Sequence, residues 1–238
     1  MLINNLTEMH CHILPGIDDG AKDIETSLAM IERLREQGAQ KIVLTPHYYS
    51  DDISLDDFLR RRDRAVNTLL RELPPGYPQL IPGAEVYISD YLFNNPNLDE
   101  LKIGNSDYIL IEHPFSTDFS QKTYDRLINL NLDYGARPIL AHIERYKALM
   151  DEKNLLNEYV EMGCLAQVNI SSFASASRHI RKKLFKFLDA GLIHLIGSDC
   201  HNLDTRPPEY ADGAKEIIKK CTPETLGRLI QNANEITK

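Results

Sequence analysis

Histidine and carboxylate side chains recur near the C-terminal ends of successive apolar segments. Glu85 and Glu112 interrupt the apolar runs LIPGAEVYI and YILIEHP, and an unpaired buried carboxylate is strongly unfavourable. A bound metal ion would remove that cost, and imidazole nitrogen and carboxylate oxygen are common metal ligands. The set therefore predicts a metal centre. Its members at strand ends are His10, His12, His47, Glu85, Glu112, His142, Asn169, Asp199 and His201.

Two pairs in this set follow the alternation of an extended strand. His10 and His12 are two residues apart, as are Asp199 and His201. Residues i and i+2 of a strand face the same side. Each pair is therefore expected to face the metal centre together, while the intervening cysteines, including Cys200, point away.

The segment IDDG, which begins five residues after His12, adds two carboxylates just ahead of Gly20 and an amphipathic helix. One of Asp18 and Asp19 is expected to bind metal, and the other to cap the helix or orient a ligand. Asp19 is the preferred ligand.

The stretch SDCHNLDTR also allows a different enzyme class. Cys200 and Arg206 have the Cys-x5-Arg spacing of thiol-based phosphatases. That chemistry requires a glycine-containing loop whose backbone N–H groups surround phosphate at a helix N-terminus. The segment HNLDT has no glycine and is followed closely by two prolines. The cysteine spacing is therefore interpreted as coincidence, and Arg206 as a phosphate-binding candidate.

The elements that must position these residues alternate between strand and helix. Ser54 and Asp57 resemble a capping pair for a helix that ends near Leu73, and glycines 38, 163 and 191 are typical helix stops. The strand candidates are residues 8–14, 41–47, 80–88, 108–114, 138–144, 165–171 and 192–201.

This alternation indicates an α/β fold in which helices cover a parallel sheet. Seven units without a Pro/Gly/Ser-rich linker favour a single domain over residues 1–238, built as a closed or nearly closed barrel. An open doubly wound sheet is the alternative. Both architectures bring the C-terminal ends of the strands to one face, so the metal-binding candidates would converge.

Composition limits the possible partners. The 238-residue chain is 42% hydrophobic with a formal net charge of −8, so a sizeable core is available and nucleic acid is a disfavoured partner. No apolar run approaches the ~20 residues that span a bilayer, and the N-terminus does not resemble a signal peptide. Four cysteines without C-x2-C spacing fit a reducing compartment. A cytoplasmic protein without membrane insertion is expected.

Six motifs in chain order carry a resemblance to a known family: HCHILPGIDDG, TPH, GAEVYI, LIEHP, AHIERY and GSDCHNLDTRPP. They resemble the polymerase-and-histidinol-phosphatase (PHP) superfamily, most closely its bacterial protein-tyrosine phosphatases, which regulate capsule and exopolysaccharide synthesis. The resemblance implies a distorted seven-stranded (β/α)7 TIM-like barrel that carries three metal ions, usually manganese. The implied substrate is phosphotyrosine on a partner bacterial tyrosine kinase with a tyrosine-rich tail.

The resemblance also implies a role for individual residues. It assigns metal binding to His10, His12, Asp19, His47, Glu85, Glu112, His142, Asp199 and His201, and phosphate binding to Arg145 and Arg206.

The donor set determines the expected chemistry. Five imidazoles and four carboxylates suit Mn²⁺, with Fe or Zn possible at some positions, and nine ligands can hold three ions if Glu85 bridges. Three divalent ions would exceed four carboxylates by about two positive charges, which favours a phosphate substrate. We expect direct attack by a metal-bound hydroxide, with Arg145 and Arg206 binding phosphate oxygens.

Several alternatives remain at this stage. A small-molecule phosphatase of the histidinol-phosphate type would share the barrel and metals, and an exonuclease or a non-catalytic scaffold for the kinase would also fit the fold. His113, His179 and His194 are interpreted as structural. The basic stretches RRRDR (60–64) and RHIRKK (178–183) are expected to be solvated helix faces; the alternative is that one binds an acidic, tyrosine-bearing tail of the kinase.

Overall fold

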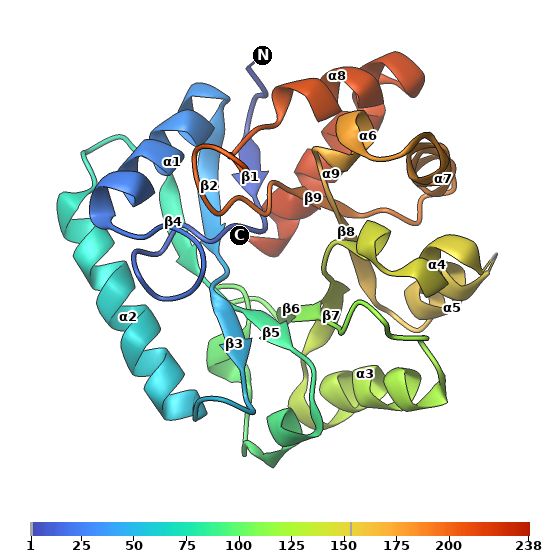
Figure 1. Cartoon of the computed structure of the whole chain (residues 1–238), viewed down its shortest axis with the longest axis horizontal. Helices are drawn as coiled ribbons and strands as arrows, with labels where there is room; N and C mark the ends of the chain where they lie inside the picture. The colour runs from blue at the N-terminus through green and yellow to red at the C-terminus, as the bar shows by residue number, and fades with distance from the viewer. Residues whose placement is uncertain (1, 153) are drawn as a thin grey trace.

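Parallel strands occupy the centre of the molecule, and helices surround them (Figure 1). The computed structural model describes residues 2–152 and 154–238. The strands form a three-stranded sheet, in the order β1-β2-β4, and a six-stranded sheet, in the order β3-β5-β6-β7-β8-β9. All neighbouring strands in both sheets pair in parallel, which confirms the predicted α/β class with parallel sheets. The strands are β1 (Leu6–Glu8), β2 (Ala39–Leu44), β3 (His47–Tyr49), β4 (Gln79–Pro82), β5 (Glu85–Tyr87), β6 (Tyr108–Glu112), β7 (Arg137–Leu140), β8 (Leu165–Asn169) and β9 (Leu195–Gly197).

The helices begin and end largely where the sequence predicts. The Ser54 hydroxyl accepts a hydrogen bond from the Asp57 N–H, and the capped helix α2 ends one residue before Leu73. In the described residues, no helix is both long and apolar enough to cross a membrane. The helices are α1 (Ile24–Glu36), α2 (Leu55–Glu72), α3 (Gln121–Tyr134), α4 (Lys147–Asp151), α5 (Leu155–Glu161), α6 (Ser172–Ser175), α7 (Arg178–Asp189), α8 (Ala211–Lys220) and α9 (Pro223–Ile236), with 3₁₀ turns η1 (Asp90–Asn94), η2 (Asp99–Leu101) and η3 (Ile143–Arg145).

Three predicted strands extend too far. β1 ends at Glu8, β7 at Leu140 and β9 at Gly197, so an extended strand through 8–14, 138–144 or 192–201 is wrong. His142 and Asp199 have positive φ angles of 32° and 54°, a left-handed conformation that interrupts an extended chain. Most of the predicted metal ligands from these segments therefore lie in turns just beyond the strands.

Two other predicted strands each divide into two. The break between β2 and β3 falls at Thr45 and Pro46, and the break between β4 and β5 falls at residues 83–84. Pro46 has no N–H to donate to a ladder, although its carbonyl accepts from the Glu85 N–H at 3.0 Å. In both cases the chain passes from the three-stranded sheet into the six-stranded sheet.

Backbone hydrogen bonds join the segments that follow β1 and β9. The Asp199 N–H donates to the His10 carbonyl at 2.7 Å, and the His12 N–H donates to the Cys200 carbonyl at 2.9 Å. Cys11 and Cys200 form an isolated parallel bridge between these hydrogen bonds. Segments from opposite ends of the chain thus lie side by side.

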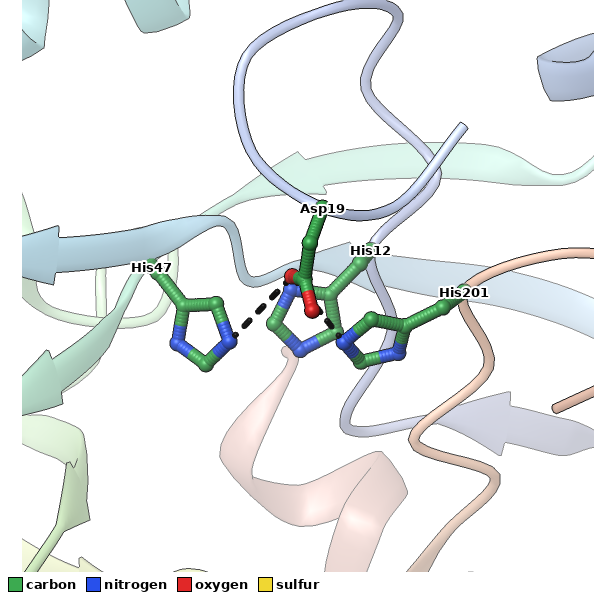
Figure 2. A group of neighbouring side chains, drawn as sticks. All are labelled: His12, Asp19, His47 and His201. Carbon is green, nitrogen blue, oxygen red and sulfur yellow. Dashed lines mark ion pairs between the residues drawn. The ribbon is translucent and has the colours of Figure 1, made fainter. Parts of the chain in front are cut away.

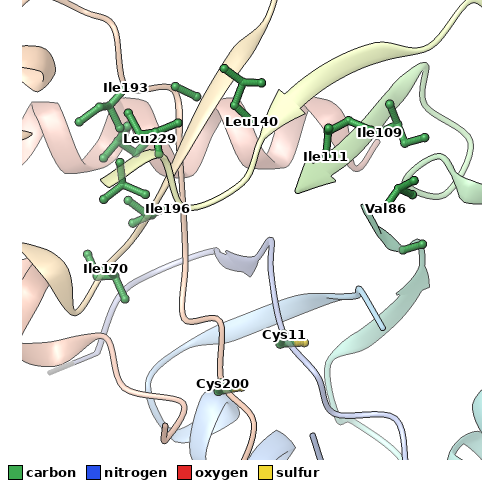
Figure 3. Packing of buried hydrophobic residues seen from close by; sticks show 14 of the residues in the cluster. Cys11, Val86, Ile109, Ile111, Leu140, Ile170, Ile193, Ile196, Cys200 and Leu229 are labelled. Carbon is green, nitrogen blue, oxygen red and sulfur yellow. The ribbon is translucent and has the colours of Figure 1, made fainter. Parts of the chain in front are cut away.

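Strand β6 shows how the core directs residues toward the site. Ile109 and Ile111 lie in the larger hydrophobic cluster, together with residues of the helices (Figure 3). Leu110 alternates with them and belongs to a second cluster, which joins residues from five strands and α9. Glu112 lies two residues after Leu110, so it continues this second row beyond the apolar residues.

Candidate metal centre

The nine predicted metal ligands converge. Most of them lie at or beyond the C-terminal ends of strands, whereas His47 and Glu85 follow β2 and β4 and are the first residues of β3 and β5. Donor atoms within three groups lie within 4.8 Å of one another: His12, Asp19, His47 and His201; His10, His12 and Glu85; and His47, Glu85 and Glu112. The other two predicted ligands adjoin these groups. His142 Nε2 is 2.9 Å from Glu85 Oε1, and Asp199 Oδ1 is 3.5 Å from the Nε2 atoms of His10 and His12.

Glu85, at the start of β5, lies at the centre of the cluster. Its Oε2 atom is 3.1 Å from His10 Nε2, 3.2 Å from His12 Nε2 and 3.1 Å from His47 Nδ1. Its other oxygen contacts His142, and the side chain is only 1% exposed. The two oxygens of this carboxylate face different imidazoles, an arrangement that suits the bridging role predicted for Glu85.

The two adjacent aspartates of IDDG face different partners. Asp19 points toward two imidazoles, with its Oδ1 atom 3.6 Å from His47 Nε2 and 3.3 Å from His201 Nε2 (Figure 2). Asp18 Oδ2 is 2.8 Å from His12 Nδ1, and the same oxygen accepts the His47 backbone N–H at 3.1 Å. Asp18 therefore contacts His12 and His47, and Asp19 faces two imidazoles of the cluster; metal binding by Asp19 stays a prediction.

The loop that carries these aspartates contacts the backbone of His12. The Ala21 N–H donates to the His12 carbonyl at 2.9 Å. A Cβ atom at Gly20 would lie 2.1 Å from that carbonyl oxygen. Only glycine permits this approach, so Gly20 allows the loop to reach the cluster.

Both predicted phosphate-binding arginines lie beside the cluster and contact the same carboxylate. Arg145 Nη2 is 2.6 Å from Asp199 Oδ2, and Arg206 Nη2 is 2.7 Å from Asp199 Oδ1. The Asn169 amide also donates to Asp199, at 2.8 Å. These residues, together with Ser198, line a cavity of about 320 Å³. Asp199 is the predicted metal ligand in the lining of this cavity, which also contains Glu209 and Asp212.

The residues present fit a metal centre. Burial of a polar atom without a partner costs about 1–3 kcal/mol, and a cation that the atoms share would offset that cost. Close approach without hydrogen-bond geometry, as between Glu85 and three imidazoles, is what ligands of a common ion require. Three buried atoms that face other members of the cluster lack a hydrogen-bond partner among the described residues: His47 Nδ1, Glu85 Oε2 and His201 Nε2.

Neighbouring imidazoles favour the ionised forms of Glu85 and Asp18. Burial would raise the pKa of Glu85, but the neighbouring imidazoles, His10 first, lower that pKa well below its usual range. Burial also opposes ionisation of Asp18, whose hydrogen bond with His12 nevertheless lowers the pKa to about 2. Conversely, burial would lower the pKa of His12, and its bonds to carboxylates raise it well above the usual value. Buried negative charge of this kind attracts cations.

Two buried residues that hold the predicted ligands were missed in the sequence. Gln167 Oε1 accepts the His142 N–H at 2.7 Å and lies 3.2 Å from His10 Nδ1. Glu8 Oε1 accepts the N–H groups of His10 at 2.9 Å and Ser198 at 3.0 Å. The signal for Gln167 was present, because it interrupts the apolar run LAQVNIS as Glu85 interrupts its own.

The residues predicted to lie outside the site do so. Burial lowers the pKa of His113 to about 3, and its ring packs 5.0 Å from that of Phe119. His194 Nδ1 accepts a backbone N–H at 3.2 Å, and His179 lies 3.9 Å from an aspartate on the exposed surface. Cys200 is fully buried in the hydrophobic core (Figure 3), as expected if its thiol has no catalytic role.

Known proteins resemble this chain along nearly its full length. It is 32% identical over 241 residues to the tyrosine-protein phosphatase CpsB of Streptococcus agalactiae serotype V, and the match covers 98% of each chain. It is 31% identical over 233 residues to the tyrosine-protein phosphatase YwqE of Bacillus subtilis, and the match covers 96% of this chain and 90% of the relative.

Solved structures agree. A chain from the crystal structures of YwqE from Bacillus subtilis and CpsB from Streptococcus pneumoniae, described as unique metal-dependent tyrosine phosphatases, matches with a TM-score of 0.84 at 28% identity. The match covers 97% of this chain and 94% of the other. The phosphotriesterase homology protein of Escherichia coli, at 12% identity and a TM-score of 0.56, shares the fold alone.

A family model described as "Capsular polysaccharide synthesis, CpsB/CapC" matches residues 6–238. The resemblance to bacterial protein-tyrosine phosphatases, predicted from six short motifs, is thereby confirmed. This chain belongs to the CpsB/CapC family of capsular polysaccharide synthesis proteins.

Proposed function

We propose that this chain is a metal-dependent protein-tyrosine phosphatase, a phosphoric monoester hydrolase that acts on phosphotyrosine. The observation that carries the proposal is the convergence of nine nitrogen- and oxygen-donor side chains beside two arginines. Relatives named as tyrosine-protein phosphatases support the choice of substrate. We infer that its partner is a bacterial tyrosine kinase of capsule synthesis that has a tyrosine-rich tail. We also infer that the protein acts in the cytoplasm.

The donor set supports three Mn²⁺ ions, with Fe or Zn at some positions. The nine predicted ligands would hold these ions, and Glu85, which belongs to two of the three donor groups, is the residue we infer to be shared between ions. When bound, these ions would lower the pKa of the attacking water and offset charge on the phosphate oxygens. Asp18, Gln167 and Glu8 would hold the ligands in place, through contacts with their side chains or backbone.

Arg145 and Arg206 would bind the phosphate group of the substrate. Both guanidinium groups are partly exposed and contact Asp199 at the edge of the cluster. Guanidinium groups bind phosphate oxygens in a bidentate manner and offset charge that develops in the transition state. The phenolate that leaves has a conjugate acid with a pKa of about 10, so it needs less protonation than an alkoxide.

We also infer that the two sheets form one distorted seven-stranded (β/α)7 TIM-like barrel, and that residues 1–238 form a single domain. Support comes from the backbone hydrogen bonds that join the segments after β1 and β9, and from the chain continuity between β2 and β3 and between β4 and β5. In such a barrel the active site lies at the C-terminal ends of the strands.

Substrate preference and metal dependence test this function together. The Mn²⁺-loaded enzyme is expected to hydrolyse a phosphotyrosine peptide with a higher kcat/KM than histidinol phosphate, and to lose activity when a chelator removes the metal. A higher kcat/KM for histidinol phosphate would favour the small-molecule phosphatase. Binding of no metal, even with excess Mn²⁺, would favour a scaffold.

A pair of substitutions separates the metal mechanism from a thiol mechanism. Asp199→Ala is expected to reduce kcat/KM by about 100-fold or more, because even outer-shell changes at metal sites cost 10–100-fold. Cys200→Ser is expected to retain most of the activity, since its thiol faces the core. An inactive Cys200→Ser enzyme with its full metal content would contradict the proposal.

A further inference from the structure

A groove runs from the predicted metal ligands to the exposed face of α2. Its inner part, a cavity of about 460 Å³, is lined by Asp19 and His47 of the cluster and by Tyr49 and Phe58. Its outer part, a cavity of about 410 Å³, lies between α2 and the loop that follows β1. Both parts share Ile17 and Arg61, so they adjoin. We call this feature the α2 groove.

One face of α2 forms a wall of the outer cavity. The residues that line it from the helix are Arg61, Arg64, Ala65 and Thr68. Their spacing of three, four and seven residues places them on the same helix face. The opposite wall is the loop after β1, whose Ile17 carbonyl lies 3.4 Å from Arg61 Nη2. The outer cavity therefore combines apolar walls with two guanidinium groups.

The guanidinium groups of the two arginines in the outer cavity are not neutralised by a carboxylate of the described residues. In the described part of the chain, Arg61 and Arg64 are exposed and form no ion pair, whereas their neighbour Arg60 pairs with Asp57 and Arg62 with Asp63. Among the described residues, no acidic side chain lines the outer cavity, whereas Asp18, Asp19 and Asp52 line the inner one. Positive charge is thus concentrated there, in a chain whose formal net charge is −8.

The other basic stretch of the sequence, RHIRKK, lies on α7, and its residues line neither of these two cavities. Arg181 pairs with Glu216 at 2.7 Å, and Lys183 pairs with Asp151 at 3.0 Å. Internal carboxylates therefore already neutralise part of RHIRKK. Among the described residues, Arg178 and Lys182 are exposed and form no ion pair, as is true of Arg61 and Arg64. What distinguishes RRRDR is its position, because Arg61 lines the cavity that contains Asp19 and His47.

We propose that the α2 groove binds an acidic side chain that flanks the phosphotyrosine of the protein substrate. The inference rests on the proposed phosphatase function. With phosphate at the cluster, the inner cavity gives the tyrosine ring apolar and aromatic walls at Ile17, Tyr49 and Phe58. An extended peptide spans about 3.3–3.6 Å per residue, so a carboxylate a few residues away reaches Arg61 and Arg64. The enzyme thereby selects phosphotyrosines in acidic segments.

Matched peptides test this selection. Three phosphotyrosine peptides of equal length carry glutamate, alanine or lysine at the positions on both sides of the phosphotyrosine. For the Mn²⁺-loaded wild-type enzyme at low salt, kcat/KM is expected to be about 3- to 10-fold higher for the glutamate peptide than for the alanine peptide, as exposed ion pairs provide. The lysine peptide is expected to have the lowest value.

Charge reversal identifies the residues responsible. The double variant Arg61→Glu/Arg64→Glu is expected to invert the order, with a higher kcat/KM for the lysine peptide than for the glutamate peptide. Arg71→Glu, at an exposed position near the end of the same helix, is the matched control and is expected to keep the wild-type order.

The outcomes distinguish this proposal from the one on which it rests. Turnover of none of the three peptides would reject the phosphatase function and the groove together. Equal turnover of all three by the wild-type enzyme, or an unchanged order in the double variant, would reject the groove alone.

Discussion

The site consists of buried polar side chains whose partners are other buried polar side chains. Glu85 and Asp199 are 1% and 2% exposed, yet imidazole or guanidinium groups surround both. Such groups are costly to bury singly, whereas a connected network or a shared cation compensates each member. The same argument extends to Gln167. Its side-chain oxygen contacts the ring of His10 and the backbone N–H of His142.

Gln167→Met is expected to weaken Mn²⁺ binding by about 10- to 100-fold, as for other groups that orient metal ligands. The substitution removes the oxygen that faces His10 Nδ1 and accepts the His142 N–H. The dissociation constant for Mn²⁺, measured by calorimetry, is the readout, since a purely structural role would change stability without this shift.

The conservative variant Gln167→Glu provides the control. It retains the acceptor oxygen, so its Mn²⁺ affinity is expected to lie closer to that of the wild type than to that of Gln167→Met. Wild-type affinity in Gln167→Met would show that the contact does not position the ligands.

At the scale of elements, close backbone approach places the site. α8 packs against the end of β8 through Gly213, where a Cβ atom would lie 2.0 Å from the Ile170 carbonyl oxygen. Ile170 directly follows Asn169, which donates to Asp199. The position of α8 is therefore coupled to the edge of the predicted metal centre.

Gly213→Ala is expected to destabilise the protein by about 1–3 kcal/mol, because the added methyl group forces α8 away from β8. Gly227→Ala is the matched control in α9, where a Cβ atom would meet nothing within 4 Å. It is expected to stabilise by about 0.5–1 kcal/mol, since alanine is the better helix former. Urea unfolding measures both, and equal effects of the two substitutions would contradict this account of the contact.

At the scale of the whole molecule, the cluster connects distant parts of the chain. His10 and His12 follow β1 in the three-stranded sheet, His47 and Glu85 begin strands of the six-stranded sheet, and His201 follows its last strand. A ligand that binds only the folded state stabilises that state. Metal binding is therefore coupled to the joining of the two sheets.

Mn²⁺ at 100 times its dissociation constant is expected to raise the free energy of unfolding by about 2.7 kcal/mol per site. Thermal unfolding of the metal-free protein, followed with increasing Mn²⁺, measures this increase as a rise in Tm. The rise is expected to be smaller in Asp199→Ala, because the variant lacks one predicted ligand. A Tm independent of Mn²⁺ in the wild type would contradict a metal centre.

The class of fold, the family and the set of residues that converge could be predicted from the amino-acid sequence. Glu85 and Glu112 lie within apolar segments, and this position predicts that they are buried. The alternation of strands and helices predicts parallel sheets. These features are local or periodic, so they can be read without knowing which segments meet. The six motifs were also sufficient for the family, which the comparisons confirm.

The conformation of the chain at the site could not be predicted from the sequence and depends on the packing of the folded protein. The positive φ angles of His142 and Asp199, the break at Pro46 and the contacts of Gln167 were not predicted. The pairing of Arg145 with Asp199 was also unforeseen. Each depends on contacts between segments far apart in sequence. A hydrophobic pattern predicts which residues are buried, but it does not predict which atoms they contact. The register between strands and the close contacts between segments form only when the segments pack together.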